Sequence, residues 1–357
     1  MTSAQNLADG ALGTVLLHLE TSNWPAAHTA LRAAVADGVS IAGGASLYYG
    51  APALAYVLAT IDQPSITRAK AIAATGTATV TRRRLETAHR RIDHRQRPVT
   101  SEYDLIRGLT GLGVVLRRIG DLELLREVLT YLTRLTEPLD GLPGWWCPTG
   151  PDRTRPGPVG GHSNHGLAHG ITGPLALLAL TLTDGIEVDR QRAAITRICD
   201  WLDQWEHQTG DLRWWPEICT LDDLDRGTVR QPEPPRPSWC YGTLGITRAQ
   251  QLAARALHDT ARQHAAETAF TACVNDPHQL DRLTGMGLCH GTGGLLATGR
   301  RIAADALTPI PTTPLLHRHQ RTTAPPVPPL GLLDGTTGAT LATAGLTTSW
   351  DACLLLC

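Results

Sequence analysis

The sequence has very little lysine or phenylalanine: Lys70 and Phe270 are the only residues of their kind among 357. Arginine, alanine, glycine and proline are abundant, which we interpret as a trace of genomic base composition. No stretch of about 18 uninterrupted apolar residues occurs, so a membrane-spanning helix is not expected. The net charge is -1, without a long block of like charge. This balance disfavours nucleic acid or a membrane surface as the main partner.

Cysteine is present, but not in the pattern of a disulfide framework. Eight unevenly spaced cysteines in a chain of this length do not indicate a fold held together by disulfide bonds. The N-terminal segment also lacks a basic flank followed by an apolar run, as a signal peptide would have. We therefore expect a cytoplasmic protein with reduced thiols. Residues 1–357 are expected to form a single domain with a large core.

One segment departs from the even charge distribution because it is rich in arginine. Its basic residues are Arg82, Arg83, Arg84, Arg90, Arg91, Arg95 and Arg97. Their helical spacing favours a solvated helix face, and the alternative is a docking surface for an acidic peptide segment.

A glycine-centred phrase followed by an apolar helical run occurs seven times. The intervals between the phrases are 40 to 72 residues, each long enough for two helices, and the first glycines are Gly10, Gly50, Gly108, Gly170, Gly242, Gly291 and Gly335. Amphipathic helical patterns such as 122–132 and 194–202 lie between them, and strand-like alternation is scarce. The pattern predicts an all-α fold, an α/α toroid with one glycine phrase at the start of each inner helix and an outer ring of helices around it.

Three segments interrupt the helical pattern. Residues 137–165 and 216–237 are rich in glycine or proline and are expected to form long loops near the functional site. Residues 308–330 are rich in proline and threonine and are expected to form an exposed linker.

Two phrases contain metal-ligating residue types: Cys240 in Ser-Trp-Cys-Tyr-Gly, and Cys289 with His290 before Gly291. Two thiolates and an imidazole, with a fourth position left open, are what a catalytic zinc ion requires. Each candidate directly precedes a glycine phrase, so neighbouring inner helices would deliver all three to one end of the barrel. Convergence requires a non-helical turn, because adjacent residues diverge by about 100° on a helix. Buried structural cysteines and a capping histidine are the alternative.

His169 precedes its glycine phrase as His290 does, so it is expected at the same end of the barrel. Its unperturbed pKa suits proton transfer near neutrality, which makes it a candidate acid or base. Asp104 precedes Gly108 by one helical turn and would orient His169 or a substrate amide, unless it serves only as a helix cap. A histidine-rich metal cluster with His162 and His165 is disfavoured, because the thiolate set already supplies three ligands.

These motifs together resemble the LanC lanthipeptide cyclases, which close thioether rings in ribosomally made peptides. The resemblance spans nearly the whole chain. It rests on Tyr103-Asp104 with Gly108 and Gly111, Gly166 to Gly173, Arg236 with Trp239-Cys240-Tyr241-Gly242, Cys289-His290-Gly291, and Ser349-Trp350-Asp351.

The resemblance implies zinc held by Cys240, Cys289 and His290, with His169 as the acid/base residue. It also implies an essential role for Asp104 and an active-site role for Arg236. The implied reaction adds a peptide cysteine thiolate to dehydroalanine or dehydrobutyrine, which forms lanthionine or methyllanthionine. Zinc-bound water is the alternative proton donor to His169.

The implied substrate is a dehydrated precursor peptide, and a separate dehydratase and an exporter are the expected partners. Some family members carry an SH2-like extension between the third and fourth repeats, but only 62 residues separate Gly108 from Gly170 here, so the docking of a leader peptide is open. The alternative function is a non-catalytic zinc toroid that binds cysteine peptides or glutathione as a scaffold. Protein prenyltransferases share a related toroid, but the sixteen aromatic residues, with a single phenylalanine, disfavour their aromatic isoprenoid funnel.

Overall fold

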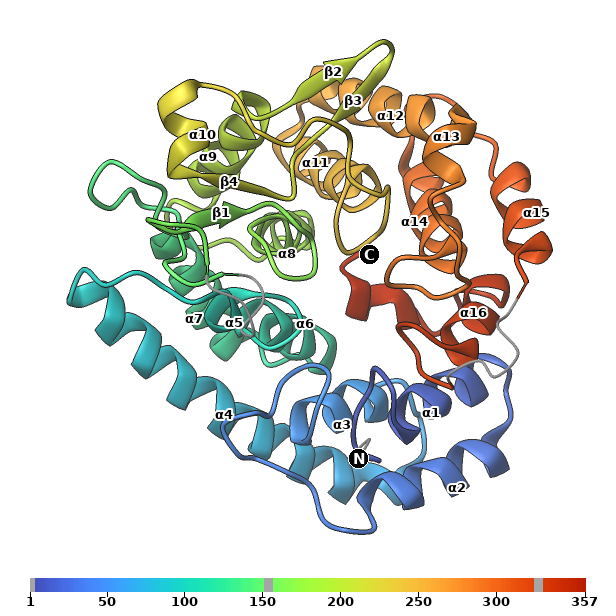
Figure 1. Ribbon diagram of the computed structural model, residues 1–357. Coiled ribbons are helices and arrows are strands. Elements are labelled where there is room, and N and C mark those ends of the chain that lie inside the picture. Colours follow the sequence, from blue (N-terminus) through green and yellow to red (C-terminus); the bar gives the residue numbers. More distant parts are fainter. Residues whose placement is uncertain (1–3, 151–156, 324–329) are drawn as a thin grey trace.

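The computed structural model describes residues 4–150, 157–323 and 330–357 (Figure 1). Inner helices form a closed ring in which each packs on the next and α16 packs on α1. In chain order they are α1 (Ala11–Glu20), α3 (Ala51–Leu58), α6 (Leu109–Ile119), α8 (Thr172–Thr183), α11 (Thr243–Leu257), α14 (Thr292–Asp305) and α16 (Thr336–Thr343). The predicted all-α toroid is confirmed.

Outer helices cover this ring, each packed on the inner helix that precedes it along the chain. They are α2 (Trp24–Val35), α4 (Thr67–Asp93), α7 (Leu122–Leu135), α9 (Gln191–Gln204), α12 (Thr260–Asn275) and α15 (Thr313–Arg321). Helix α7 buries one apolar stripe, whereas α8 is buried along nearly its whole length, as expected for helices of an outer and an inner ring. None of the described helices combines the length and the apolar character needed to cross a membrane.

The glycine phrases lie at the N-terminal ends of the inner helices, as predicted. The first glycine is the N-cap of every inner helix except α8, where Gly170 lies two residues before Thr172. The second glycine permits a tight fold-back. A β-carbon at Gly111 or Gly245 would collide with the carbonyl oxygen of the residue six positions earlier. The repeated spacing therefore records a repeated turn that holds the preceding residues against the first turn of each helix.

The C-terminal segment fills the interior of the ring, where the C-terminus is marked in Figure 1. It includes the 3-10 helix η2 (Trp350–Leu354), whose residues are all buried. Asp351 forms an ion pair with Arg301 of α14 at 2.6 Å. The indole N–H of Trp239 donates to the carbonyl of Leu354 at 2.9 Å, which connects this segment to the turn before α11.

In the part of the chain that the structure describes, four short strands form two antiparallel pairs that the sequence did not predict. Strand β1 (His162–Asn164) pairs with β4 (Ile218–Thr220), and β2 (His207–Thr209) pairs with β3 (Leu212–Trp214). Three-residue strands are too short for a period of two to be visible in a sequence. The two segments expected as loops are thus joined to each other through β1 and β4. The remaining short elements of the described residues are η1 (Pro64–Ile66), α5 (Thr100–Tyr103), α10 (Leu221–Arg226) and α13 (Pro277–Leu280).

The expected linker at 308–330 differs from the structure over 313–321, which form helix α15. Leu315 and His319 of this helix are buried, so packing against α14 stabilises it despite the proline-rich surroundings. Composition alone did not reveal these two inward-facing positions. The end of the expected linker, residues 324–329, lies outside the described residues.

Candidate metal centre

The turns that precede the inner helices are joined edge to edge by backbone hydrogen bonds at one end of the barrel. These bonds run from the amide of Leu105 to Ala168 (3.1 Å), Leu167 to Cys240 (3.0 Å), Cys240 to Cys289 (3.2 Å) and Cys289 to Leu333 (2.8 Å). Because neighbouring turns are fixed in this way, side chains that are distant in the sequence meet at this end.

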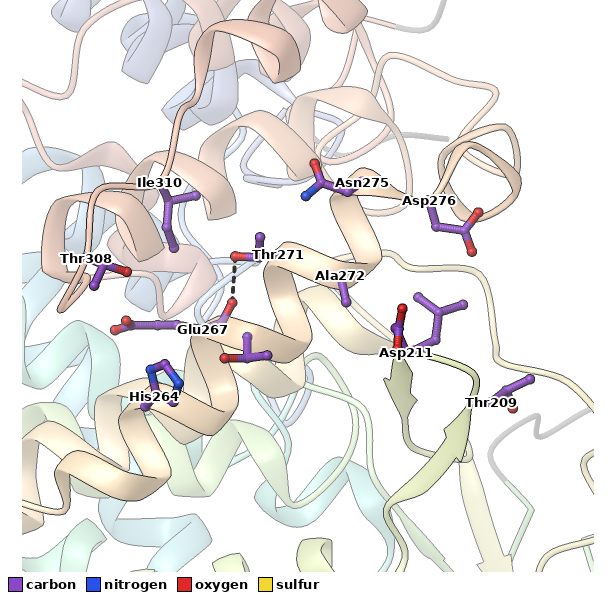
Figure 2. Close-up of a pocket in the computed structure, with 12 residues that line it drawn as sticks. Thr209, Asp211, His264, Glu267, Thr271, Ala272, Asn275, Asp276, Thr308 and Ile310 are labelled. Atoms are coloured by element: carbon purple, nitrogen blue, oxygen red, sulfur yellow. Dashed lines mark hydrogen bonds between the residues drawn. The ribbon is translucent and has the colours of Figure 1, made fainter.

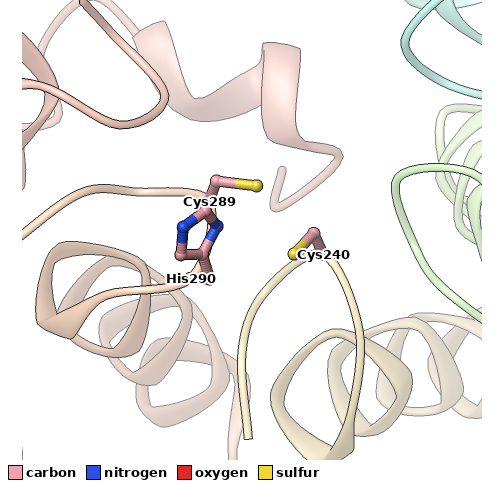
Figure 3. Close-up of side chains that lie close together, drawn as sticks. All are labelled: Cys240, Cys289 and His290. Carbon is pink, nitrogen blue, oxygen red and sulfur yellow. The ribbon is translucent and has the colours of Figure 1, made fainter. Parts of the chain in front are cut away.

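Cys240, Cys289 and His290 converge there (Figure 3). Their potential ligand atoms all lie within 4.8 Å of one another. Cys289 and His290 lie in the irregular turn before α14, which is the non-helical backbone that their convergence requires. Cys240 is buried, and the other two are partly exposed. The cluster is therefore accessible from one side.

The electrostatics of the cluster stabilise negative charge on sulfur. A hydrogen bond from the Cys289 thiol is the largest cause that holds the pKa of Cys240 well below its usual value, and contacts with His290 and Ser238 act in the same direction against the effect of burial. The same contact with Cys240 raises the pKa of Cys289, and an interaction with Cys240 raises the pKa of His290. A buried thiolate beside a second thiol and an imidazole is a donor set that fits zinc.

His169 and Asp104 form a second group at this end of the barrel. Nδ1 of His169 lies 2.7 Å from Oδ2 of Asp104, which is buried, whereas the histidine side chain is 41% exposed. An ionised carboxylate only accepts hydrogen bonds, so Nδ1 carries the proton and Nε2 is left for a substrate. The other oxygen, Oδ1, accepts from the amides of Arg107 and Gly108 at 2.7 Å. Asp104 therefore caps the turn before α6 and also orients His169.

Arg236 is exposed and lies four residues before Cys240. Its guanidinium has no hydrogen-bond partner among residues 4–150, 157–323 and 330–357, and its charge acts on Cys289 and His290. The arginine is thus near the cluster and not committed to a structural contact.

The family model for lanthionine synthetase C-like proteins matches residues 3–349 of the chain. The chain belongs to this family. This lanthionine synthetase C-like chain is 26% identical over 205 residues to the nisin biosynthesis protein NisC of Lactococcus lactis subsp. lactis, and the match covers 55% of the chain and 48% of that relative. The matched segment thus spans about half of the relative's length.

The fold of this lanthionine synthetase C-like chain is also similar to that of a solved structure titled nisin cyclase. The TM-score is 0.84 at 20% sequence identity, over 100% of this chain and 93% of the other. At this identity the likeness concerns the fold, and it agrees with the closed double ring described above.

Two residues near the cluster were not assigned a role from the sequence. Oδ1 of Asp334 lies 3.4 Å from Nδ1 of His290, and the hydroxyl of Ser238 lies 3.4 Å from the sulfur of Cys240. A carboxylate behind a ligating histidine fixes its ring orientation and leaves the other nitrogen for the metal. Asp334 directly precedes Gly335, and His169 and His290 occupy the same position in their own phrases. The repeat could therefore have identified Asp334 from the sequence.

His162 and His165 do not join the metal-type cluster. Nδ1 of His165 donates to the carbonyl of Pro216 at 3.0 Å, and its Nε2 accepts from the Trp201 indole at 3.0 Å. Both ring nitrogens are therefore used. Neither nitrogen of buried His162 has a partner among the described residues. Burial lowers the pKa of each histidine to about 4.

These buried neutral histidines predict a loss of stability in acid. Unfolded histidine binds a proton near pH 6.5, whereas folded His165 remains neutral until about pH 4, so the unfolded state binds more protons between these values. The His165 contribution to the free energy of unfolding should be present above pH 6.5 and decrease by up to about 3 kcal/mol as the pH falls to 4. Urea unfolding of wild type and His165→Asn should show a flatter pH dependence in the variant.

His317→Asn is the matched control, because His317 is exposed on α15. It should retain the wild-type slope. Equal slopes for wild type and His165→Asn would contradict the prediction.

Gly242 supports Cys240 through backbone conformation. Its φ of 98° lies in the region that favours glycine, and a β-carbon there would collide with the carbonyl oxygen of Arg236. Gly242→Ala should therefore lower the free energy of unfolding by about 3 kcal/mol, from the unfavourable φ and from overpacking. It should also weaken metal binding, because the turn carrying Cys240 must shift. Denaturant unfolding and metal titration measure the two effects.

Gly120→Ala separates the two causes. Gly120 ends α6 with a φ of 78°, and a β-carbon there would meet nothing within 4 Å. This variant should lose only about 1 kcal/mol and bind metal normally. If Gly120→Ala loses as much free energy of unfolding as Gly242→Ala, close approach to the Arg236 carbonyl does not explain the effect at Gly242.

A separate hollow of about 720 Å³ lies on the outside of the toroid, between α12 and the β2–β3 hairpin (Figure 2). Its buried carboxylate, Glu267, accepts from Gln251 and Gln263 through one oxygen and from the amide of Leu307 through the other. Both oxygens are thus used in fixing the backbone after α14. This network is structural, and the metal-type cluster remains the candidate site.

Proposed function

We propose that this chain is a zinc-dependent lanthipeptide cyclase that forms lanthionine or methyllanthionine rings. The observation that carries the proposal is the convergence of Cys240, Cys289 and His290 at the end of the barrel that also carries the His169–Asp104 pair. Family membership supports it. Binding a thiol requires only the metal ligands, whereas an oriented, partly exposed histidine suits proton transfer.

Cys240, Cys289 and His290 would hold the zinc ion, and Asp334 would orient His290. A bound zinc ion with an open position lowers the pKa of a substrate thiol. The peptide sulfur bonds to the β-carbon of the dehydro residue. The π electrons of the carbon–carbon double bond in that residue then form an enolate. Arg236 would stabilise that negative charge.

His169 would complete the addition by protonating the α-carbon through Nε2. The buried Asp104 stabilises the imidazolium form and holds the ring in place. The thiol loses one proton and the α-carbon gains one, so the ring is an isomer of the linear peptide. No further reactant is consumed.

The substrate in this proposal is a precursor peptide in which serine or threonine has already been dehydrated. A dehydratase must therefore act first, and an exporter is the expected later partner. All eight cysteines are free in the structure, and the reducing cytoplasm expected from the sequence would keep them and the substrate thiol reduced.

Thiol counting on a synthetic peptide tests the proposal. The peptide contains one dehydroalanine and, several residues later, one cysteine. Ring closure does not change its mass, but it removes the thiol that N-ethylmaleimide would alkylate. The zinc-loaded protein should abolish alkylation faster than spontaneous closure does. Zinc and peptide binding without acceleration would instead favour the non-catalytic scaffold.

A further inference from the structure

The chain of backbone hydrogen bonds around the site end of the barrel has one gap. The amide of Leu7 donates to Tyr48, and that of Leu332 donates to Ala8, so the turns before α16, α1 and α3 continue the connections described above. Between the turn before α3 and the turn before α6, no backbone hydrogen bond joins the described residues.

A side chain from the outer ring spans this gap. Arg84 of α4 donates through one guanidinium nitrogen to the carbonyl of Arg107, before α6, and through the other to that of Gly43, before α3. The two turns are therefore bridged by a guanidinium group instead of by a backbone hydrogen bond. Arg84 belongs to the arginine-rich segment for which the sequence left two interpretations open.

The gap opens into a pocket of about 730 Å³ on the same end of the barrel as the metal-type cluster. Both turns line it, together with Arg83 and Arg84 of α4. Arg107 on its wall is connected to the proposed acid/base group, because its amide donates to the Asp104 carboxylate that holds His169. The pocket thus adjoins the proposed active site.

The pocket carries excess positive charge. Arg83, Arg84 and Arg107 form no ion pair with any described residue, and the guanidinium contacts of Arg83 and Arg84 are to backbone carbonyls. The acid in the lining, Glu102, is already paired with Arg91 at 2.8 Å and accepts from Tyr131. Arg83 and Arg107 thus keep guanidinium donors for a negatively charged ligand, and the unpaired charge of Arg84 adds to the attraction.

Apolar surface accompanies these charges. Val99 is 39% exposed, and Ile106 and Tyr49 on the same lining are partly exposed. Arginines beside small apolar areas suit a peptide that alternates carboxylate and apolar side chains, and this charge complementarity favours such a peptide as the occupant. A purely solvated helix face, the simpler interpretation of the sequence, would not bridge two turns of the inner ring.

We propose that this pocket binds a carboxylate-bearing segment of the peptide substrate, and thereby holds the rest of the peptide at the metal centre. The inference rests on the proposed function for the identity of the peptide. The carboxylates are aspartate or glutamate side chains, because several arginines lie beside apolar areas along the lining.

Fluorescence anisotropy with three labelled peptides tests the inference. The first alternates aspartate and leucine and has an amidated C-terminus, the second replaces aspartate by asparagine, and the third is the asparagine peptide with a free C-terminal carboxylate. Wild type should bind the first peptide at least tenfold more tightly than the second, and the preference should weaken with salt. A gain by the third peptide alone would show that the pocket takes a C-terminal carboxylate and would overturn the inference.

Arg83→Gln/Arg107→Gln should lose about tenfold in affinity for the first peptide. The control, Arg90→Gln/Arg95→Gln, removes the same charge from exposed arginines that pair with Glu86 and Asp140 outside the pocket. It should stay within twofold of wild type. Equal binding of all three peptides by wild type, or equal losses in the two double variants, would overturn the inference.

Zinc content and thiol loss from the short dehydroalanine peptide, made without acidic residues, are measured on the same proteins. Arg83→Gln/Arg107→Gln should match wild type in zinc content. Failure of the proposed function would appear as absent ring closure in wild type, whatever the anisotropy shows. Failure of the present inference would leave ring closure intact and abolish the peptide preference.

Discussion

Cys240→Ala is expected to lose its zinc ion and the accompanying ring-closing activity, whereas wild type holds one equivalent per chain. Four-ligand zinc sites have apparent binding free energies of about 10–16 kcal/mol, so one ligand contributes about 3 kcal/mol, or more than 100-fold in affinity. The expected loss is larger here because Cys240 is the buried thiolate of the cluster and interacts with both other members. Metal analysis after gel filtration gives the stoichiometry, and thiol counting gives the activity.

Cys273→Ala is the matched control for the loss of a buried thiol. Cys273 lies on α12, and burial raises its pKa to about 12, so it remains a neutral packing residue. This variant should keep its zinc and its activity even where its stability falls. A wild-type protein without zinc, or a Cys240→Ala variant that retains a full equivalent, would rule out the proposed metal centre.

The sequence predicted the toroid because the fold repeats one local structural motif. Each glycine phrase marks the tight turn at the start of an inner helix, and the collision that a β-carbon would cause at Gly111 or Gly245 explains why the phrase recurs. The same repeat placed Cys240, Cys289 and His290 at one end of the barrel. Their convergence followed from topology and did not require any long-range contact to be known.

Features that depend on contacts between distant segments were not predicted. The burial of the C-terminal segment depends on Arg301 and Trp239, which meet it only in the folded ring. The bridging role of Arg84 depends on the carbonyls of two turns that lie far from it in the sequence. Asp334 could be predicted only in part: the sequence shows its position in the repeat, but not its proximity to His290. Side-chain partners across a closed ring have no local pattern to reveal them.

The second large effect is expected when the hydrogen-bonded pair of His169 and Asp104 is changed. Ring closure should slow, and the metal should stay bound. His169→Asn should slow ring closure by about 100-fold or more, the usual contribution of a positioned acid or base, and keep one equivalent of zinc. Asp104 has two roles that substitutions can separate. Asparagine retains an oxygen that accepts from the amides of Arg107 and Gly108, but it has no charge to stabilise a protonated imidazole.

Asp104→Asn should therefore unfold close to the wild-type denaturant midpoint and yet approach His169→Asn in its rate of ring closure. Asp104→Ala should also lose about 1–2 kcal/mol in the free energy of unfolding, because the amides of Arg107 and Gly108 lose their acceptor. If both substitutions reduce stability equally and Asp104→Asn keeps its full rate, Asp104 acts only as a cap. If His169→Asn closes rings at the wild-type rate, the proton reaches the α-carbon from another donor, and this histidine has no part in the chemistry.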